Sequence, residues 1–129
     1  MIDHVGFAVG DAERSRGFYA AALAPIGVTL VMSVTPEQTE AGGTAHGFGT
    51  AGNPFFWIGD NEKVGEGTHV AFAVQTRAEV DAFHAAAIEA GGTDNGAPGP
   101  RPHYGPDYYA AFVRDPDGNN IEAVCRAAA

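Results

Sequence analysis

Basic residues, cysteine and long hydrophobic runs are all scarce in this sequence. Only seven Lys and Arg stand against 16 Asp and Glu, so the formal net charge is −9 and no basic face is expected for nucleic-acid phosphates or an anionic membrane surface. The single cysteine, Cys125, cannot form a disulfide within the chain, which fits a reducing compartment. No apolar run approaches the ~20 residues that cross a bilayer, and residues 1–4 carry no basic leader segment. We therefore expect a cytoplasmic protein that binds neither nucleic acid nor membranes.

What the chain does contain is an internal repeat. The segment DHVGFAVGDAERSRGFYAAALAPIG, from Asp3, aligns with THVAFAVQTRAEVDAFHAAAIEAGG, from Thr68, at an offset of 65 residues (68 minus 3). The alignment places His4 on His69, and Phe, Ala and Gly residues match in register after them. Two similar βα units formed by common propensities alone are the alternative to duplication. The length and the apolar fraction of 45% predict a single domain, 1–129, made of two repeated modules, about 1–62 and 66–129.

Each module is predicted to have the element order βαβββ. The repeat begins with period-two alternation, in which bulky residues share one strand face while one histidine and small residues share the other. Helices are expected over residues 12–23, with Asp11 as N-cap, and from Thr76, which opens a capping box, to about Ala90. Further strands are expected near residues 28–34, 44–48, 55–59, 108–114 and 120–124, with a weaker strand near 101–104. The fold class is therefore α+β.

Two histidines and one glutamate are the candidate metal ligands. His4 and His69 occupy equivalent places in the repeat, beside small residues that leave room, and they can converge if the two sheets face each other about a pseudo-twofold axis. Glu122 lies within the last expected strand, where a carboxylate is costly to bury unless it is paired or bound to metal. Two imidazoles and one carboxylate suit divalent Fe, Mn, Zn or Ni and leave positions open for water or substrate. Structural histidines and an exposed edge glutamate are the alternatives.

Three segments carry a family resemblance: IDHVGFAVGD at the start, GTHVAFAV in the middle and RDPDGNNIEAV near the end. Together with the duplicated βαβββ order, they resemble the vicinal oxygen chelate superfamily, which contains glyoxalase I, extradiol dioxygenases, methylmalonyl-CoA epimerase, fosfomycin-resistance thiol transferases and bleomycin-resistance proteins. The resemblance implies a cup-shaped, barrel-like eight-stranded mixed sheet with helices outside. It also implies a metal held by His4, His69 and Glu122, in a site that is often shared across a homodimer.

One position departs from the glyoxalase I pattern. That enzyme adds a fourth ligand, usually Glu, from the strand that mirrors the strand of Glu122. The repeat offset places Trp57 there, whereas an alignment of the two Gly-Asn pairs places Phe56 there. Neither side chain can bind a metal. A three-ligand site is closer to that of the dioxygenases and thiol transferases, so this departure disfavours glyoxalase I and epimerase chemistry.

A Gly- and Pro-rich segment, GPRPHYGPDYYAAF, is a candidate wall of the cup. It supplies Tyr109 and His103 as catalytic acid or base candidates beside Glu122, and the alternative is a surface loop whose tyrosines pack on the core. The residues expected to line the substrate pocket are His46, Trp57, Arg101, Tyr104 and Tyr108.

These patterns favour a metal-dependent enzyme that acts on a small oxygen-rich substrate. The reaction class stays open among dioxygenase, lyase or isomerase, and thiol transferase. Fosfomycin-type transfer is disfavoured, because a phosphonate pocket needs several cations and only Arg101 and Arg114 lie near the expected cup. The alternative function is a metal-free protein of the bleomycin-resistance type, whose acidic groove would capture a cationic drug. Metal content separates these two hypotheses.

Overall fold

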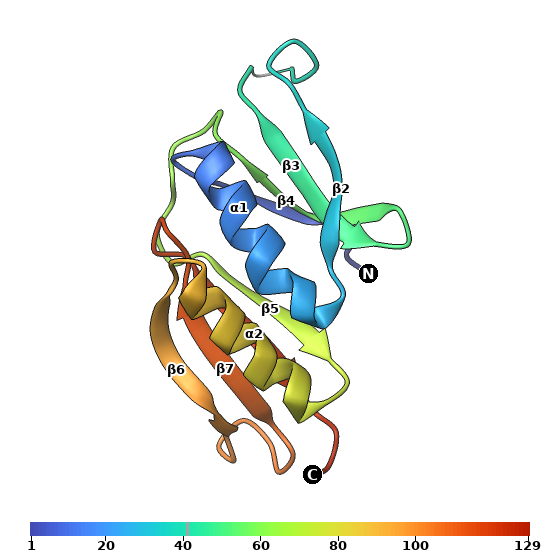
Figure 1. The fold of residues 1–129 in the computed structure, drawn as a ribbon, viewed down its shortest axis with the longest axis vertical. Helices are drawn as coiled ribbons and strands as arrows, with labels where there is room; N and C mark the ends of the chain where they lie inside the picture. Colours follow the sequence, from blue (N-terminus) through green and yellow to red (C-terminus); the bar gives the residue numbers. More distant parts are fainter. Residues whose placement is uncertain (41) are drawn as a thin grey trace.

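The computed structural model describes residues 1–40 and 42–129, which form two modules with the predicted βαβββ order (Figure 1). Module 1 contains β1 (Val5–Ala8), α1 (Ala12–Leu23), a short 3-10 helix (Ala24–Ile26), β2 (Thr29–Val34), β3 (Ala45–Thr50) and β4 (Asn53–Gly59). Module 2 contains β5 (His69–Val74), α2 (Arg77–Glu89), β6 (Thr93–Pro100), β7 (Tyr109–Arg114) and β8 (Asn120–Cys125). The predicted α+β class is confirmed.

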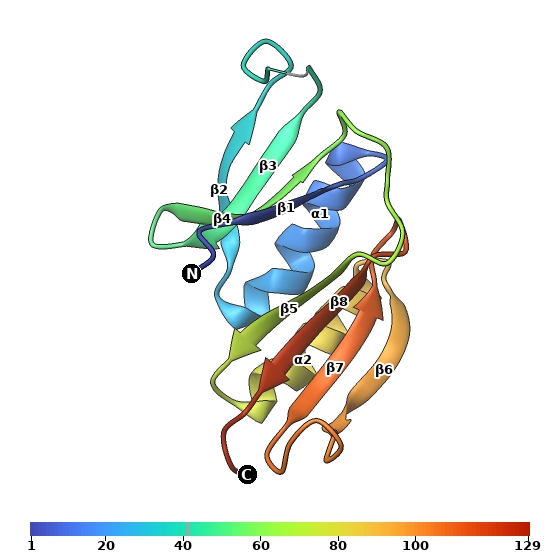
Figure 2. The same cartoon turned by 180° about the vertical axis from the view of Figure 1, so that it is seen from behind.

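Each module folds its strands into a four-stranded mixed sheet. The strand orders are β1-β4-β3-β2 and β5-β8-β7-β6, with the first strand of each module parallel to the last and the other neighbours antiparallel. Figure 2 shows both sheets on the face of the molecule opposite the helices, one beyond the other along the long axis. The strands therefore form two open sheets, and the closed barrel-like arrangement that the family resemblance implied is not made by these strands.

The helices begin where the sequence predicts. Asp11 is the N-cap of α1, and its carboxylate accepts hydrogen bonds from the backbone N–H groups of Glu13 and Arg14 at 3.1 and 3.0 Å. Thr76 and Glu79 form a reciprocal capping box at the start of α2. Such caps satisfy backbone donors that the first helical turn leaves free, and each stabilises its helix by about 1 kcal/mol. Neither helix of the described residues is long and apolar enough to cross a membrane.

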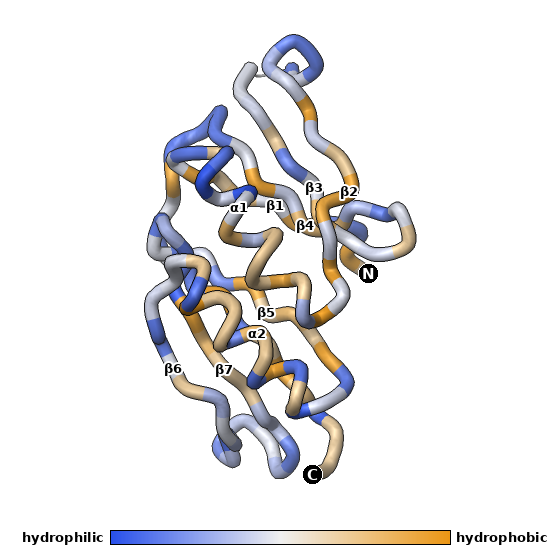
Figure 3. Tube along the Cα trace, in the orientation of Figure 1, coloured by the Kyte–Doolittle hydropathy of each residue, from blue (hydrophilic) through white to orange (hydrophobic). Residues whose placement is uncertain are grey.

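The two modules share one aromatic core. Tyr19 of α1 lies edge-on to Phe18 and Phe56, with ring centroids 4.9 and 5.0 Å apart, and Phe56 of β4 contacts Phe72 of β5 at 5.1 Å. These rings are buried, and each buried aromatic side chain contributes about 1.5–3 kcal/mol. Hydrophilic residues instead gather in the loop after β2 and in the segment between β4 and β5 (Figure 3). Helix packing on one side thus leaves the opposite sheet faces free to carry polar chemistry.

One expected strand lies elsewhere. The weaker strand predicted near residues 101–104 is wrong, because those residues form turns and β6 spans Thr93–Pro100 instead. The sequence of β6, TDNGAPGP, resembles a loop, since Gly and Pro are rare inside strands. It pairs only with β7, and that pairing has two register shifts. A one-sided, irregular edge strand tolerates these residues.

Candidate functional site

The structure brings His69 and Glu122 together on the open face of module 2. His69 begins β5, and Glu122 lies on β8 directly opposite Ala71. The imidazole Nε2 is 3.0 Å from Glu122 Oε1, and the imidazole Nδ1 is 3.0 Å from the backbone carbonyl oxygen of Asn120. Glu122 is only 2% exposed although it carries a carboxylate. Its second oxygen, Oε2, accepts a hydrogen bond from the Tyr108 hydroxyl at 2.5 Å.

These contacts show which nitrogen of His69 faces Glu122 and which faces the backbone. A carbonyl oxygen can only accept, so Nδ1 must carry a hydrogen to bond with Asn120. In the neutral ring, Nε2 then presents its lone pair to Glu122 Oε1, and two lone pairs facing each other at 3.0 Å repel. A hydrogen on Nε2 turns the contact into a hydrogen bond, and a metal ion bound by both atoms would replace that bond. A backbone carbonyl that holds the distal nitrogen of a histidine is also the usual outer-shell partner of a metal-binding imidazole.

Tyr108 fixes the other side of the carboxylate. Burial, followed by its hydrogen bond to Glu122 and the charge of that residue, raises the pKa of Tyr108 to about 12. The hydroxyl therefore stays protonated at neutral pH and donates to Oε2. Glu122 Oε1 is left to face His69, so the pair presents one nitrogen and one oxygen, a donor set that fits divalent transition metals.

A hollow of about 500 Å³ opens over this pair, and we call it the Glu122 hollow. The Phe112 ring stacks on His69 with centroids 6.2 Å apart, and the guanidinium of Arg126 lies 4.8 Å from the centroid of the Tyr108 ring. Its walls are aromatic and polar, as in small-molecule sites generally. The lining residues are His69, Tyr104, Tyr108, Phe112, Asn120, Glu122 and Arg126.

Phe112 and Arg126 are members that the sequence reasoning did not identify. Phe112 pairs directly with Glu122 across β7 and β8. The turn Asp115-Pro116-Asp117-Gly118 sets that register, so counting back from the turn is the signal that would have found Phe112. Arg126 directly follows β8 and lies four residues after Glu122, at the end of the alternating face.

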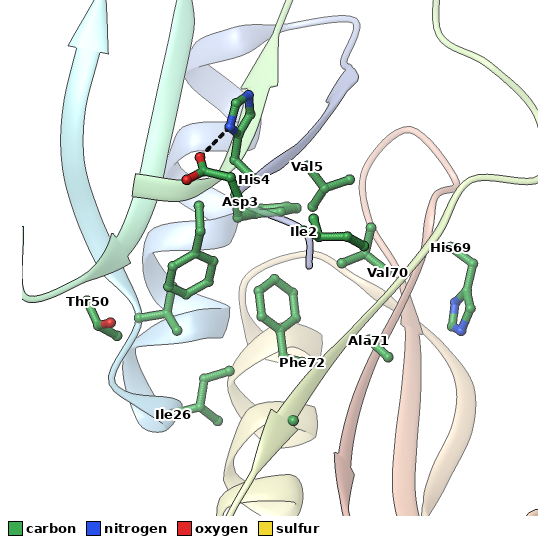
Figure 4. Close-up of a pocket in the computed structure, with 14 residues that line it drawn as sticks. Ile2, Asp3, His4, Val5, Ile26, Thr50, His69, Val70, Ala71 and Phe72 are labelled. Atoms are coloured by element: carbon green, nitrogen blue, oxygen red, sulfur yellow. Dashed lines mark hydrogen bonds and ion pairs between the residues drawn. The ribbon is translucent and has the colours of Figure 1, made fainter. Parts of the chain in front are cut away.

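His4 does not reach this pair within one chain. It precedes β1, is exposed, and its Nδ1 lies 2.7 Å from Asp3 Oδ1. Figure 4 shows the His4 and His69 rings on opposite sides of the hydrophobic side chains Val5, Ile2 and Val70, pointing away from each other. Among the described residues, no three His, Cys, Asp or Glu side chains are close enough to hold a metal ion. Within a single chain, the structure thus supplies two of the three expected ligands.

The strand register identifies the residue that mirrors Glu122. Glu122 lies between Ala71 and Phe112, whereas Trp57 lies between Gly6 and Gly47 in the same places of module 1. The offset of 65 residues therefore holds, and Trp57 is the equivalent residue. Phe56 points into the core and is fully buried. Trp57 lines a hollow of about 520 Å³, which we call the Trp57 hollow.

His46 and Tyr109 lie on the helix side of their sheets, so neither lines the hollow expected for it. His46 is 3% exposed, with Nδ1 2.7 Å from Ser33 Oγ and Nε2 2.9 Å from Glu13 Oε2 of α1. The Tyr109 hydroxyl donates to Asp81 of α2 at 2.7 Å, and this hydrogen bond, followed by burial, raises its pKa. Strand alternation explains both placements, since each residue neighbours one that faces the open side.

Arg101 and His103 lie near the rim. Arg101 donates to the carbonyl oxygens of Gly99 and Ala97 at 2.9 and 2.8 Å, and its guanidinium is 5.4 Å from the centroid of the Phe112 ring. The exposed His103 packs against Tyr104 with ring centroids 4.1 Å apart. Arg101 thus stabilises the β6–β7 connection, while Tyr104 joins the lining of the Glu122 hollow.

Known structures share this architecture. A glyoxalase/bleomycin resistance protein from Albidiferax ferrireducens T118 is 34% identical, with a TM-score of 0.77 over 98% of this chain and 99% of that one. A mutant of glyoxalase I from Zea mays is 28% identical, with a TM-score of 0.71 over 95% of this chain but 45% of that one. An enzyme of the glyoxalase/bleomycin resistance protein/dioxygenase family from Burkholderia phytofirmans PsJN shares the fold, with a TM-score of 0.70, 20% identity, and coverage of 97% and 98%.

No curated protein matches the chain. The family model described as the Glyoxalase/Bleomycin resistance protein/Dioxygenase superfamily matches residues 1–123, nearly the whole length. With the duplicated βαβββ fold already evident, the chain belongs to this superfamily.

Proposed function

We propose that this chain is a metal-dependent enzyme of the glyoxalase and dioxygenase type that acts on a small oxygen-rich substrate, with its metal centre built on His69 and Glu122. The carrying observation is that Nε2 of His69 faces Glu122 Oε1 at 3.0 Å while Nδ1 is held by the Asn120 carbonyl. That contact brings one imidazole nitrogen and one carboxylate oxygen within 3.0 Å of each other on the adjacent strands β5 and β8. Both atom types bind divalent transition metals.

His4 is proposed to complete the centre from a second copy of the chain. In one copy it directly precedes β1 of the other sheet and is exposed. Its neighbours Ile2 and Val5 are exposed hydrophobic residues, 83% and 40% accessible, and they suit a protein contact. A twofold homodimer places the open face of module 1 in one copy against the open face of module 2 in the other, so that each dimer contains two complete centres.

The residues of the chain have distinct proposed roles at this centre. A divalent ion held by His69, Glu122 and His4 supplies Lewis acidity toward two adjacent oxygen atoms of a substrate. Tyr108 keeps its proton and holds the carboxylate in position. Phe112 and Tyr104 supply aromatic walls to the hollow. Trp57 offers no carboxylate at the mirror position, so the protein supplies no base there, which favours the three-ligand reaction classes.

The test is metal analysis of chain purified without chelator. We expect about one divalent ion per chain, lost in His69→Ala and Glu122→Gln. His84→Ala is the matched control, since His84 pairs with Asp94 at 2.9 Å on α2 and β6, away from the hollow, and it should keep its metal. Metal content that is the same in all four proteins contradicts the proposal.

Sharing between copies has its own test. His4→Ala and His69→Ala homodimers should each lack metal, but a heterodimer of the two retains one intact centre. Mixing and exchanging equal amounts should therefore restore binding at about a quarter of the sites. No recovery would show that His4 is not donated across a dimer.

Capture of a cationic drug without metal is the second candidate. The net charge of −9 and the aromatic residues Tyr104, Tyr108 and Phe112 favour it. A chain that carries no metal and that binds an organic cation equally well with and without EDTA would support this alternative over the enzyme.

A further inference from the structure

Module 1 carries an aromatic ring where module 2 carries its carboxylate. Trp57 and Glu122 hold the same register position, each on the last strand of its module and each opposite the first strand. The residues that pair with Trp57 and Glu122 on the neighbouring strands also differ between the modules. Module 2 has Phe112 beside Glu122, and module 1 has Gly47 beside Trp57.

Gly47 makes the space that the indole occupies. A Cβ atom at Gly47 would lie 2.8 Å from Cζ2 and 2.9 Å from Cη2 of Trp57, closer than carbon atoms normally approach. On the other side, a Cβ atom at Gly6 would lie 3.2 Å from Trp57 Cβ. The six-membered ring therefore lies over the backbone of β3 at Gly47. Each module therefore has one large flat ring at this place on its open face, Phe112 in module 2 and Trp57 in module 1.

This ring borders space of the right size for a small molecule. The Trp57 hollow measures about 520 Å³, within the roughly 300–1,000 Å³ of ordinary ligand pockets. Its lining also includes residues of β1 together with Asn61, Glu62, Lys63 and Thr68, which supply polar and charged groups of both signs. In the part of the chain that the structure describes, Trp57 forms none of the close aromatic pairs that fill the core. The indole is thus available to stack on something other than the protein.

The geometry points to Trp57 as the residue that selects ligands with a flat, conjugated ring, by stacking that ring in the Trp57 hollow. The inference deepens the proposed function and rests on it for the oxygen-binding end, since a twofold dimer sets the open face of module 1 opposite the metal centre of module 2. The ligands that Trp57 would favour are planar ring compounds small enough for the Trp57 hollow. An indole prefers a flat partner, because offset stacking of two π systems adds to the gain from burial alone.

Two probe ligands distinguish affinity gained by ring stacking from affinity gained by hydrophobic burial alone. Mandelate and hexahydromandelate carry the same α-hydroxy acid group, but one has a phenyl ring and the other a puckered cyclohexyl ring. We expect isothermal titration of the wild-type chain, as isolated, to show mandelate binding roughly three- to ten-fold more tightly. The preference should persist in Trp57→Phe and disappear in Trp57→Leu. Because Trp57 is the sole tryptophan, its fluorescence should also be quenched as mandelate saturates the wild type.

Each other outcome overturns the assignment. Equal affinities for the two probes, a preference that survives in Trp57→Leu, absence of binding, or binding that leaves Trp57 fluorescence unchanged would all do so. If Trp57 instead packs against a second copy, Trp57→Leu weakens self-association and the ring preference is absent. Metal content distinguishes this failure from that of the proposed function. If the ring preference is absent but the chain still binds metal through His69, only the proposed role of Trp57 is wrong. If the ring preference is present but no metal binds through His69, only the proposed metal centre is wrong.

Discussion

The Tyr19 hydroxyl on α1 lies 2.5 Å from Asp115 Oδ2, in the turn between β7 and β8, and joins the two modules through a buried hydrogen bond. Asp115 is 4% exposed, and its carboxylate also accepts from Asn119 and from the backbone of Asp117. This cluster explains the RDPDGN segment structurally. Its first aspartate organises the turn that aligns Phe112 with Glu122.

Tyr19→Phe should lower the free energy of unfolding by about 1–3 kcal/mol, because it removes one donor from a buried carboxylate. Chemical denaturation monitored by circular dichroism measures the change. Tyr109→Phe is the control, since its hydroxyl bonds to an exposed partner, Asp81, and it should cost less. An equal loss in both variants would mean that burial at Asp115 does not matter.

Alkaline pH should affect stability through the same residue. Burial, followed by the charge of Asp115, raises the pKa of Tyr19 well above its usual value of 10.0. The folded state therefore favours the neutral phenol, so this stabilisation is complete below pH 10 and is lost as pH rises through the folded pKa. Denaturation midpoints should fall more steeply above pH 10 in the wild type than in Tyr19→Phe. Parallel curves would contradict the assignment.

Tyr108→Phe should weaken metal binding by roughly 10- to 100-fold, the usual effect of removing a group that orients a metal ligand. The Glu122 carboxylate would then be free to turn away from His69. Competition with a chromogenic chelator measures the dissociation constant. Tyr109→Phe again serves as the control, because its ring lies on the other side of β7, and an unchanged constant in both variants would show that Tyr108 does not position Glu122.

Gly47→Ala should displace the indole of Trp57, because the added methyl would lie 2.8 Å from its ring. The emission of the sole tryptophan should shift toward longer wavelength as the ring moves into water. Gly17→Ala in α1 is the matched control, since no atom lies within 4 Å of its added methyl. That variant should leave the emission unchanged and stabilise the helix by about 0.5–1 kcal/mol. Unchanged emission in Gly47→Ala would show that the indole does not depend on this gap.

The repeat explains why so much of the fold could be predicted. Two copies of one βαβββ pattern predict each other, and the offset of 65 residues offered Trp57 as the counterpart of Glu122, beside the alternative Phe56. The caps at Asp11 and Thr76 were predicted from the local residues. β6 escaped prediction because its Gly and Pro residues are stabilised only by pairing with β7, a contact distant in the chain. Tertiary pairing overrides local preference there.

The candidate site was harder to predict because position in a repeat does not specify direction. His4 and His69 are equivalent in sequence, yet His4 precedes β1 of one sheet while His69 begins β5 of the other, and the two rings point apart in one chain. His46 was expected to line the substrate pocket, but it alternates with Gly47 of the open face, so its imidazole lies beneath α1 against Glu13 and Ser33. The face that a strand residue occupies depends on the register, which the sequence pattern did not fix.

The two open sheets give the chain a division of labour between its halves. Glu122 and Trp57 stand on separate sheets, each with its own neighbours, so either position can change without disturbing the contacts of the other. Under the proposed roles, one half keeps the metal ligands His69 and Glu122 while its twin adapts to new molecules. Exchanging a single bulky residue in the adaptable half is then a short evolutionary route from one compound to the next.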